Sequence, residues 1–267
     1  MSRILILSSY VTIGHVGLSA GQPVCQKLGI NVTAVPTVVL SNHPGWPNVA
    51  QVPIEAEQIL RMTEALCANG WLADHSAVLV GYMPSSRHVD AAVDLVNRAK
   101  AEASHLRVVI DPILGDHPNG LYVSAEVGTA VRDKLLPLAD VTTPNLFELE
   151  WLSGRKCQSI DDAVKAAKTL GIDKIYVTST PWGPNETGIL SLDGPNVSHY
   201  QTRHFPDVPH GTGDVFAAMI AADLTVGQAL GHVLALVRSS QGRPHLEIVE
   251  ATENWLSAPE VAASKRE

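Results

Sequence analysis

The sequence is poor in cysteine and in basic residues. Its three cysteines, Cys25, Cys67 and Cys157, are widely spaced over 267 residues and form no CxxC pair. Neither a disulfide framework nor a zinc site is therefore expected. Lysine and arginine total 19 against 27 aspartates and glutamates, which gives a formal net charge of -8 at pH 7. This balance argues against nucleic acid and against an anionic membrane surface as partners.

Targeting and membrane segments are also missing from the sequence. Residues 1–9 are too short, and become polar too soon, for a secretory signal peptide, and no apolar run is long enough to span a bilayer. We therefore expect a cytoplasmic protein that does not bind a membrane. A phosphate-binding site in so acidic a chain has to be local, built from backbone N–H groups and a metal ion rather than from a basic surface.

Two common nucleotide-binding motifs are absent as well. There is no GxxxxGK[ST] sequence and no GxGxxG sequence after the first predicted strand, which argues against a Walker-type or Rossmann-type nucleotide site. No cysteine stands out as a catalytic nucleophile. Hydrophobic residues nevertheless make up 45% of the chain, enough for one large core.

What the chain does have is an alternation of strand-like and helix-like segments, judged by apolar periodicity. The predicted strands are 3–7, 32–40, 77–81, 107–110, 141–143, 174–178, and an antiparallel pair, 187–192 and 197–202. The predicted helices are 18–28, 54–68, 89–103, 125–136, 146–152, 160–170, two in succession after residue 214, and one near 246–256. This pattern predicts one α/β domain, residues 1–258, with a mostly parallel sheet covered on both faces, and a polar tail over 259–267.

Polar and turn-forming residues follow the ends of these predicted strands. In open parallel sheets, ligands bind at the carboxyl ends of the strands. The residues expected at these ends are Ser9, the loop around His43, Tyr82, Asp111, Asn145 with Glu148, and Thr178. Their clustering predicts a ligand site along this edge of the sheet.

Asp111 and Glu148 are two acids expected at neighbouring strand ends. Carboxylate oxygens suit Mg²⁺, which usually keeps several waters and is completed by substrate phosphates. Simpler explanations stand beside this one. Asp111 precedes a proline and can be a turn former, while Glu148 can complete a capping box begun by Asn145. The hydroxyls and N–H groups of residues 178–180 can contact phosphates or can form an ordinary turn after a strand.

The segment His210-Gly211-Thr212-Gly213-Asp214 precedes an apolar, alanine-rich run of helical character. A glycine turn at a helix N-terminus offers unpaired N–H groups to an anion. The carboxylate of Asp214 would repel a resting phosphate. It suits a base that accepts a proton from a hydroxyl while the turn holds a phosphoryl group in transfer. On this segment alone, an ordinary helix N-cap is the simpler explanation.

Several motifs together resemble a known family. The run Gly211 to Ala218 (GTGDVFAA) looks like the signature of the ribokinase-like superfamily. Similarity to the pyridoxal kinases within it lies in Ser9 with Gly14-His15-Val16-Gly17, Ser41-Asn42-His43, Gly81-Tyr82, Asp111 to Gly115, and Thr143 to Glu150. The motifs keep the family order from residue 9 to about residue 240. The resemblance implies a three-layer ribokinase-like fold and, commonly, a homodimer.

The resemblance also implies an activity and a set of roles. The activity is ATP-dependent phosphorylation of the 5′-hydroxymethyl group of pyridoxal, and usually of pyridoxine and pyridoxamine. Asp214 would be the base, within an anion hole made by Gly211, Thr212 and Gly213. Asp111 and Glu148 would lie near Mg²⁺ and any monovalent cation such as K⁺. The vitamer would contact Ser9, His43, Tyr82 and Asp214, and the nucleotide would contact Asp111, Tyr122, Asn145, Glu148, Thr178 and Gly213.

The chain departs from the family pattern at a few positions. Pro44 and Trp46 stand where the family often has threonine and tyrosine, and Leu121 stands where some bacterial relatives have cysteine. His210 replaces a typically small apolar residue before the glycine turn. These departures bear on vitamer preference and affinity more than on the reaction class.

Other functions stay open at this point. A hydroxymethylpyrimidine kinase of thiamine synthesis is the first alternative, although such relatives usually carry cysteine where Asp214 stands. A sugar kinase of the same superfamily usually has a longer β lid near its N-terminus. A non-catalytic homologue that binds the vitamin would be signalled by loss of Asp214 or of the glycine turn, and both are present.

Overall fold

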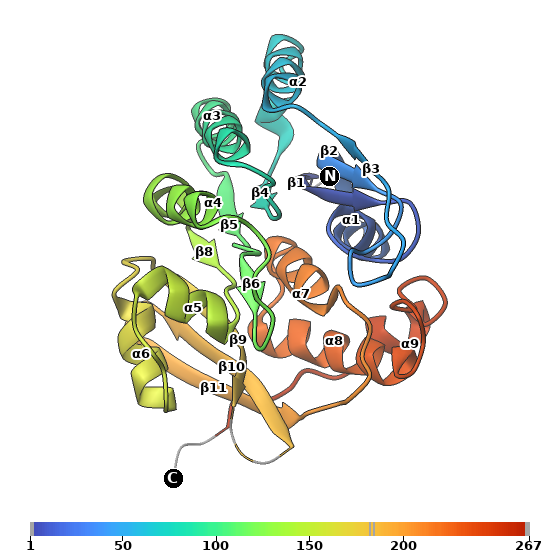
Figure 1. Ribbon diagram of the computed structural model, residues 1–267, viewed down its shortest axis with the longest axis vertical. Helices are drawn as coiled ribbons and strands as arrows, with labels where there is room; N and C mark the ends of the chain where they lie inside the picture. Colours follow the sequence, from blue (N-terminus) through green and yellow to red (C-terminus); the bar gives the residue numbers. More distant parts are fainter. Residues whose placement is uncertain (1–2, 182, 184, 265–267) are drawn as a thin grey trace.

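The computed structural model describes residues 3–181, 183 and 185–264, and a nine-stranded sheet forms the centre of this part of the chain (Figure 1). The strand order is β11-β10-β9-β8-β5-β4-β1-β2-β3. The strands are β1 Arg3–Val11, β2 Asn31–Leu40, β3 Gln51–Pro53, β4 Ala77–Val80, β5 Arg107–Ile110, β8 Val141–Thr142, β9 Lys174–Pro181, β10 Glu186–Asp193 and β11 Asn196–Arg203. The six strands from β2 to β9 pair in parallel, and β3, β10 and β11 are antiparallel to their neighbours.

Helices cover both faces of the sheet (Figure 1). They are α1 Leu18–Lys27, α2 Ala56–Ala68, α3 Ser86–Glu102, α4 Ala125–Ala130, α5 Leu146–Ser153, α6 Ile160–Lys168, α7 Thr212–Ala221, α8 Val226–Ser240 and α9 Thr252–Leu256. One face packs against α1, α7, α8 and α9, and the other against α2 to α6. The predicted α/β class, with three layers, is confirmed. None of the helices in the described residues is long and apolar enough to cross a membrane.

The central strands carry consecutive apolar residues, Ile4 to Leu7 in β1, Ala77 to Val80 in β4 and Val108 to Ile110 in β5, because both of their faces are buried there. In β1, Ile4 and Ile6 point into the core beneath α1 and α7, while Leu5 and Leu7 point into the opposite core with α2 and α3. Successive side chains of a strand point to opposite faces, so one short run of sequence contributes to two cores. This packing fixes the register of the strands, and with it the edge at which their carboxyl ends meet.

Two predicted helices are shorter than expected. The predicted helix 125–136 ends as α4 at Ala130 and continues as a π turn and then a 3-10 turn, Leu136–Leu138. Pro137 lies in that last turn and has no N–H to donate to a preceding carbonyl. The predicted helix near 246–256 is only α9, Thr252–Leu256. Before it, the N–H of Glu247 donates to Ser240 Oγ (2.9 Å), which holds this segment in a non-helical turn.

Three short strands were not predicted. β3 pairs antiparallel with β2 at the sheet edge, and β6, Gly115–Asp116, pairs with β7, Gly120–Leu121, in a small hairpin after β5. All three residues of β3 are exposed, so it has no apolar alternation that would mark it as a strand. The hairpin has two residues on each side, too few for any periodicity.

The C-terminal segment from residue 259 to residue 264 lies along α8 and β11. The N–H of Val261 donates to the Gly227 carbonyl (3.0 Å), and the N–H of Ser264 donates to the His199 carbonyl (2.6 Å). In α8, a Cβ atom on Gly231 would overlap the carbonyl oxygen of Pro259. A glycine in a helix interior normally destabilises the helix, so its presence here allows the close approach of this segment.

We predict that Gly231→Ala destabilises the full chain by about 1–3 kcal/mol, because the added methyl group meets Pro259. In a chain that ends at Ala258 the clash is gone, and the same substitution should stabilise the protein by about 0.5–1 kcal/mol through helix propensity. Urea unfolding of the four proteins measures both effects. Stabilisation by alanine in both backgrounds would contradict the packing described here.

Candidate active site

The carboxyl ends of the parallel strands meet the N-terminus of α7, and a small cavity lies between them. Its lining residues are Ile6, Ser8, Gly17, Leu79, Gly81, Asp111, Asp214 and Ala217. The structure therefore brings together Asp111 from the end of β5 and Asp214 from the first turn of α7. These two residues are separated by about a hundred positions in the chain, and the parallel sheet places them at one edge.

The glycine turn before α7 is held by the backbone around His15. Gly211 is the N-cap of α7 with φ 109°, and a Cβ atom there would overlap the carbonyl oxygen of His15. By contrast, a Cβ atom on Gly213 would meet no atom within 4 Å. Gly211 is therefore a helix N-cap, as the simpler interpretation had it, but one without a side-chain hydrogen bond to the first turn. The N–H groups of residues 212 and 213 belong to that first turn, where an anion can bind.

Asp214 is held in the cavity by the neighbouring turn. Its carboxylate accepts a hydrogen bond from the N–H of Gly17. This hydrogen bond favours the charged form of Asp214. Burial has the larger effect and raises the pKa of Asp214 to about 6. A carboxyl group with such a pKa is largely ionised at neutral pH and still able to take up a proton, as a general base must be.

Asp111 lies in the same cavity with few compensating contacts. It is 7% exposed and accepts a hydrogen bond from Thr143 Oγ1 at 3.0 Å. Burial, followed by the charges of Glu148 and Asp214, raises the pKa of Asp111 well above its usual range. Three carboxyl groups thus share one buried region, and a cation bound there would relieve their repulsion.

Glu148 has two functions in the local structure. Together with Asn145 it forms a capping box at the start of α5, with Glu148 N donating to Asn145 Oδ1 (2.9 Å) and Asn145 N donating to Glu148 Oε2 (2.8 Å). Its other oxygen accepts from the N–H groups of Leu114 (2.8 Å) and Gly115 (3.5 Å) at the start of the β6–β7 hairpin. Burial outweighs these N–H donors and raises the pKa of Glu148 to about 7. The capping-box interpretation is confirmed.

Three further predicted residues surround Glu148. Asn145 Nδ2 donates to the Gly115 carbonyl (2.8 Å), and Asn145 forms a parallel β-bridge with Thr178. Thr178 was predicted at the end of a strand, but β9 continues to Pro181 and Thr178 lies within it. Tyr122 follows β7, with a side chain that is 49% exposed. Burial of the phenol, together with Asp116, raises the pKa of Tyr122. These residues line up along the sheet edge on the side of β8 and β9, away from Ser9.

On the other side of Asp214, Ser8 is a residue that the sequence interpretation missed. Ser8 Oγ accepts from the N–H of Tyr82 at 3.2 Å, and Ser8 lines the cavity with the two aspartates. Ser9 is buried and packs against Gly17, beside the same cavity. The pairing of β1 with β2 shifts register between Ser8 and Tyr10, so Ser9 lies at the irregularity. Strand alternation alone would not show which of two adjacent serines faces a ligand.

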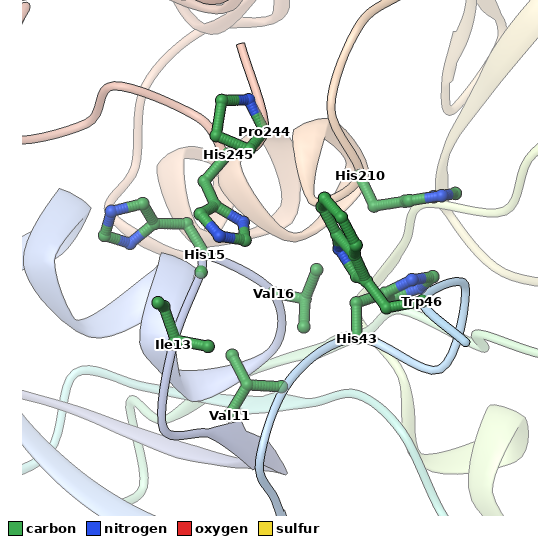
Figure 2. Close-up of a pocket in the computed structure, with 10 residues that line it drawn as sticks. Val11, Ile13, His15, Val16, His43, Trp46, His210, Pro244 and His245 are labelled. Atoms are coloured by element: carbon green, nitrogen blue, oxygen red, sulfur yellow. The ribbon is translucent and has the colours of Figure 1, made fainter. Parts of the chain in front are cut away.

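A second pocket lies next to the glycine turn and contains four histidines (Figure 2). Its lining residues are Val11, Ile13, Gly14, His15, Val16, His43, Trp46, His210, Pro244 and His245. Only His43 was predicted here as a ligand contact. The other three imidazoles come from segments far apart in the chain, and an isolated histidine in a loop carries no signal of its own. Within the described residues, no group of three or more His, Cys, Asp or Glu side chains is placed to hold a metal ion.

Comparison with known proteins agrees with this geometry. A sequence model of the phosphomethylpyrimidine kinase family matches residues 17–237. The chain is 34% identical to a pyridoxine/pyridoxal/pyridoxamine kinase of Bordetella bronchiseptica over 96% of this chain and 90% of that protein. It is 33% identical to human pyridoxal kinase over 82% of this chain and 76% of that protein.

Solved structures with a similar fold are also pyridoxal kinases. The pyridoxal kinase of Entamoeba histolytica superposes with a TM-score of 0.90 at 26% identity and covers 99% of both chains. That of Leishmania donovani, in complex with ADP and pyridoxamine, superposes with a TM-score of 0.89 at 28% identity over 98% of both chains. The chain belongs to the pyridoxal kinases.

Membership of the pyridoxal kinases confirms the ribokinase-like fold and the family resemblance that the sequence motifs indicated. The name of the matching family model refers to phosphomethylpyrimidine kinase, whereas the first alternative considered was a hydroxymethylpyrimidine kinase. The similar curated proteins cited above are named as vitamin B6 kinases instead. The aspartate at position 214 is the residue that the resemblance associates with pyridoxal kinases.

The two glycines of the turn should respond differently to substitution. We predict that Gly211→Ala lowers stability by more than about 1 kcal/mol, because the residue has a positive φ and no space for a methyl group. Gly213→Ala should leave stability within about 0.5 kcal/mol, because the methyl group enters open space.

The same Gly213→Ala variant should bind nucleotide or phosphoryl groups less well, because the methyl group occupies the space in front of the free N–H groups. Thermal unfolding and KM for ATP, measured on both variants, test this contrast. Equal losses of stability would contradict the geometry of the turn.

Proposed function

We propose that the protein transfers the γ-phosphoryl group of ATP to the 5′-hydroxymethyl group of pyridoxal and of related B6 vitamers. The observation that carries the proposal is the placement of the Asp214 carboxylate beside Asp111, at a helix N-terminus that no side chain caps. A base, an anion-binding turn and a second carboxylate are the parts that phosphoryl transfer to an alcohol requires. Relatives in the family support the substrates, since the Leishmania enzyme has been solved with ADP and pyridoxamine and with ADP and pyridoxine.

In the proposed reaction, Asp214 accepts the proton of the vitamer hydroxyl as its oxygen attacks the γ-phosphorus. The bond to the ADP oxygen breaks, and ADP leaves. The N–H groups of residues 212 and 213 donate to the phosphoryl oxygens in transfer, and the α7 dipole adds to this stabilisation. Asp214 returns its proton to solvent after the product leaves.

Asp111 and Glu148 fit a Mg²⁺ site. Their buried carboxyl groups repel one another, and a hard divalent cation suits oxygen donors of this kind. Asp111 has an oxygen that Thr143 does not use, so we assign it the closer contact. Both oxygens of Glu148 accept from backbone N–H groups, which suits contact through water. When bound, Mg²⁺ would neutralise phosphate charge, and a monovalent cation such as K⁺ is the second ion we propose near these acids.

The remaining predicted residues divide between the two substrates. On the nucleotide side we assign Asn145, Thr178 and Tyr122, which border the β6–β7 hairpin together with Glu148. On the vitamer side we assign Ser9, His43 and Tyr82, which lie at the ends of β1 and β4 and in the loop after β2.

We also propose that the protein is cytoplasmic and forms a homodimer. Support for the dimer comes from the exposed apolar side chains near the β3 edge of the sheet, namely Tyr10, Ile13, Val49 and Val52. An unpaired edge strand with exposed apolar residues is a surface that a second copy can cover. Neither nucleic acid nor a membrane is part of the proposal, in keeping with the net charge of -8.

We predict that the wild-type protein phosphorylates pyridoxal with Mg-ATP, and that Asp214→Asn lowers kcat by about 10²–10⁴-fold because the general base is lost. Vitamer binding, measured by calorimetry, should change little because asparagine keeps the shape of aspartate. Pyridoxal, pyridoxine, pyridoxamine and hydroxymethylpyrimidine are assayed in parallel. If none of the four compounds is phosphorylated, the result would favour a non-catalytic binding protein. A preference for hydroxymethylpyrimidine would show a hydroxymethylpyrimidine kinase instead.

The pKa of Asp214 predicts the pH dependence of the rate. Only the ionised carboxylate can accept a proton, and its pKa is raised to about 6. We therefore expect kcat to be nearly constant above pH 7 and to fall about tenfold per pH unit below pH 6. The profile is measured between pH 5 and 8 on wild type and on Glu148→Gln, since Glu148 also titrates near pH 7. An acid limb that disappears in Glu148→Gln would reassign the titration to Glu148.

A further inference from the structure

The loop of residues 41–47 is joined to the C-terminal third of the chain by two contacts between rings (Figure 2). His43 stacks on His210, with ring centroids 3.9 Å apart and planes inclined by 18°. Trp46 lies against His245 at 6.0 Å, with planes inclined by 48°. The closer and more parallel contact is the one with His210, the residue directly before the glycine turn of α7.

The loop has a defined shape because its residues are bonded to one another. Ser41 Oγ donates to Asn42 Oδ1 (2.6 Å), and Asn42 Nδ2 donates to the carbonyls of His43 (3.2 Å) and Asn48 (3.1 Å). The N–H of Gly45 donates to His43 Nδ1 at 3.0 Å. These bonds fix the shape of the loop, but they leave its position relative to α7 to contacts such as the His43–His210 stack.

The tautomer of His43 follows from its bond to Gly45. Nδ1 accepts the Gly45 N–H, so a neutral ring carries its proton on Nε2. Burial, and then the charge of His210, lower the pKa of His43 to about 4, and Asp116 opposes them. His43 is therefore neutral at neutral pH, and a neutral imidazole can stack on His210 without charge repulsion.

Gly45 shows how closely these groups pack. A Cβ atom on Gly45 would lie 2.9 Å from His43 Nδ1 and 3.3 Å from His210 Nε2. The loop backbone thus reaches the edge of both rings. Because the backbone of Gly211 is in turn fixed against His15, a continuous set of packed groups connects the loop to the anion-binding turn.

We propose that His210 is a positioning residue, which holds the loop 41–47 over the vitamer through its stack on His43. The inference rests on the proposed function, because that function places the vitamer between this loop and Asp214. His210 sets the closed position of the loop, and the small apolar residue that the family usually has at this position cannot stack in this way. Its contribution is to substrate binding rather than to the transfer step.

The test compares His210→Val, which removes the stack, with His210→Phe, which keeps an aromatic ring. We expect His210→Val to raise KM for pyridoxal about two- to tenfold, the range that loss of an aromatic pair gives, with kcat changed by less than about twofold. His210→Phe should restore KM to near the wild-type value. KM for ATP should stay constant in both variants, and His105→Val, at an exposed site before β5, is the matched control.

A second measurement does not depend on activity. Hydrogen exchange of the amides of residues 41–47 should become faster in His210→Val, and it should remain at the wild-type rate in His210→Phe and His105→Val. Unchanged KM and unchanged exchange in His210→Val would overturn the inference, as would a fall in kcat with no change in KM. If the wild type phosphorylates no vitamer, the proposed function fails, while the exchange experiment still decides whether His210 holds the loop.

Discussion

The approach of one backbone turn to another organises the active site. Gly211, at the start of α7, sits so close to the His15 carbonyl that no side chain fits between them. The turn from Gly14 to Gly17 follows β1, so this contact fixes the N-terminus of α7 against the end of the first strand. The N–H of Gly17 also donates to the carboxylate of Asp214. One contact between two loops therefore positions both the first-turn N–H groups of α7 and Asp214, the base in the proposed reaction.

The charges of the site depend on this arrangement. Asp111, Glu148 and Asp214 are brought to one buried region, and burial raises the pKa of each. Such a cluster is unfavourable without ligands, and it becomes favourable when a cation and a phosphate bind. The second pocket, which we assign to the vitamer, has a different chemistry, because four imidazoles and an indole line it. Residues 210–214 join the two regions, since His210 lines this pocket and Asp214 lines the cavity with Asp111.

The pattern of strands and helices was predictable because both depend on local periodicity. The parallel strands β1, β4 and β5, the helices α1 and α6, and the antiparallel pair β10–β11 lie within a few residues of their predicted positions. The family was also predictable from motifs that keep their order along the chain. The short elements could not be predicted, because β3 and the β6–β7 hairpin are held by pairing with neighbouring strands rather than by a pattern in their own sequence. Two helices are shorter than predicted for reasons that apolar spacing does not record: Pro137 lacks an N–H, and Ser240 Oγ accepts a hydrogen bond from the N–H of Glu247.

By itself, the sequence determined which residue types were available at the strand ends, since chain order and strand direction place Asp111, Asn145 and Thr178 at one edge of a parallel sheet. Only the tertiary structure decided which of them meet. It placed Ser8 as well as Ser9 at the cavity, bonded both oxygens of Glu148 to backbone N–H groups, and stacked His43 on His210. The physical reason is distance along the chain. Periodicity and caps act over a few residues, whereas these contacts join segments that only the packing of the sheet and its helices brings together.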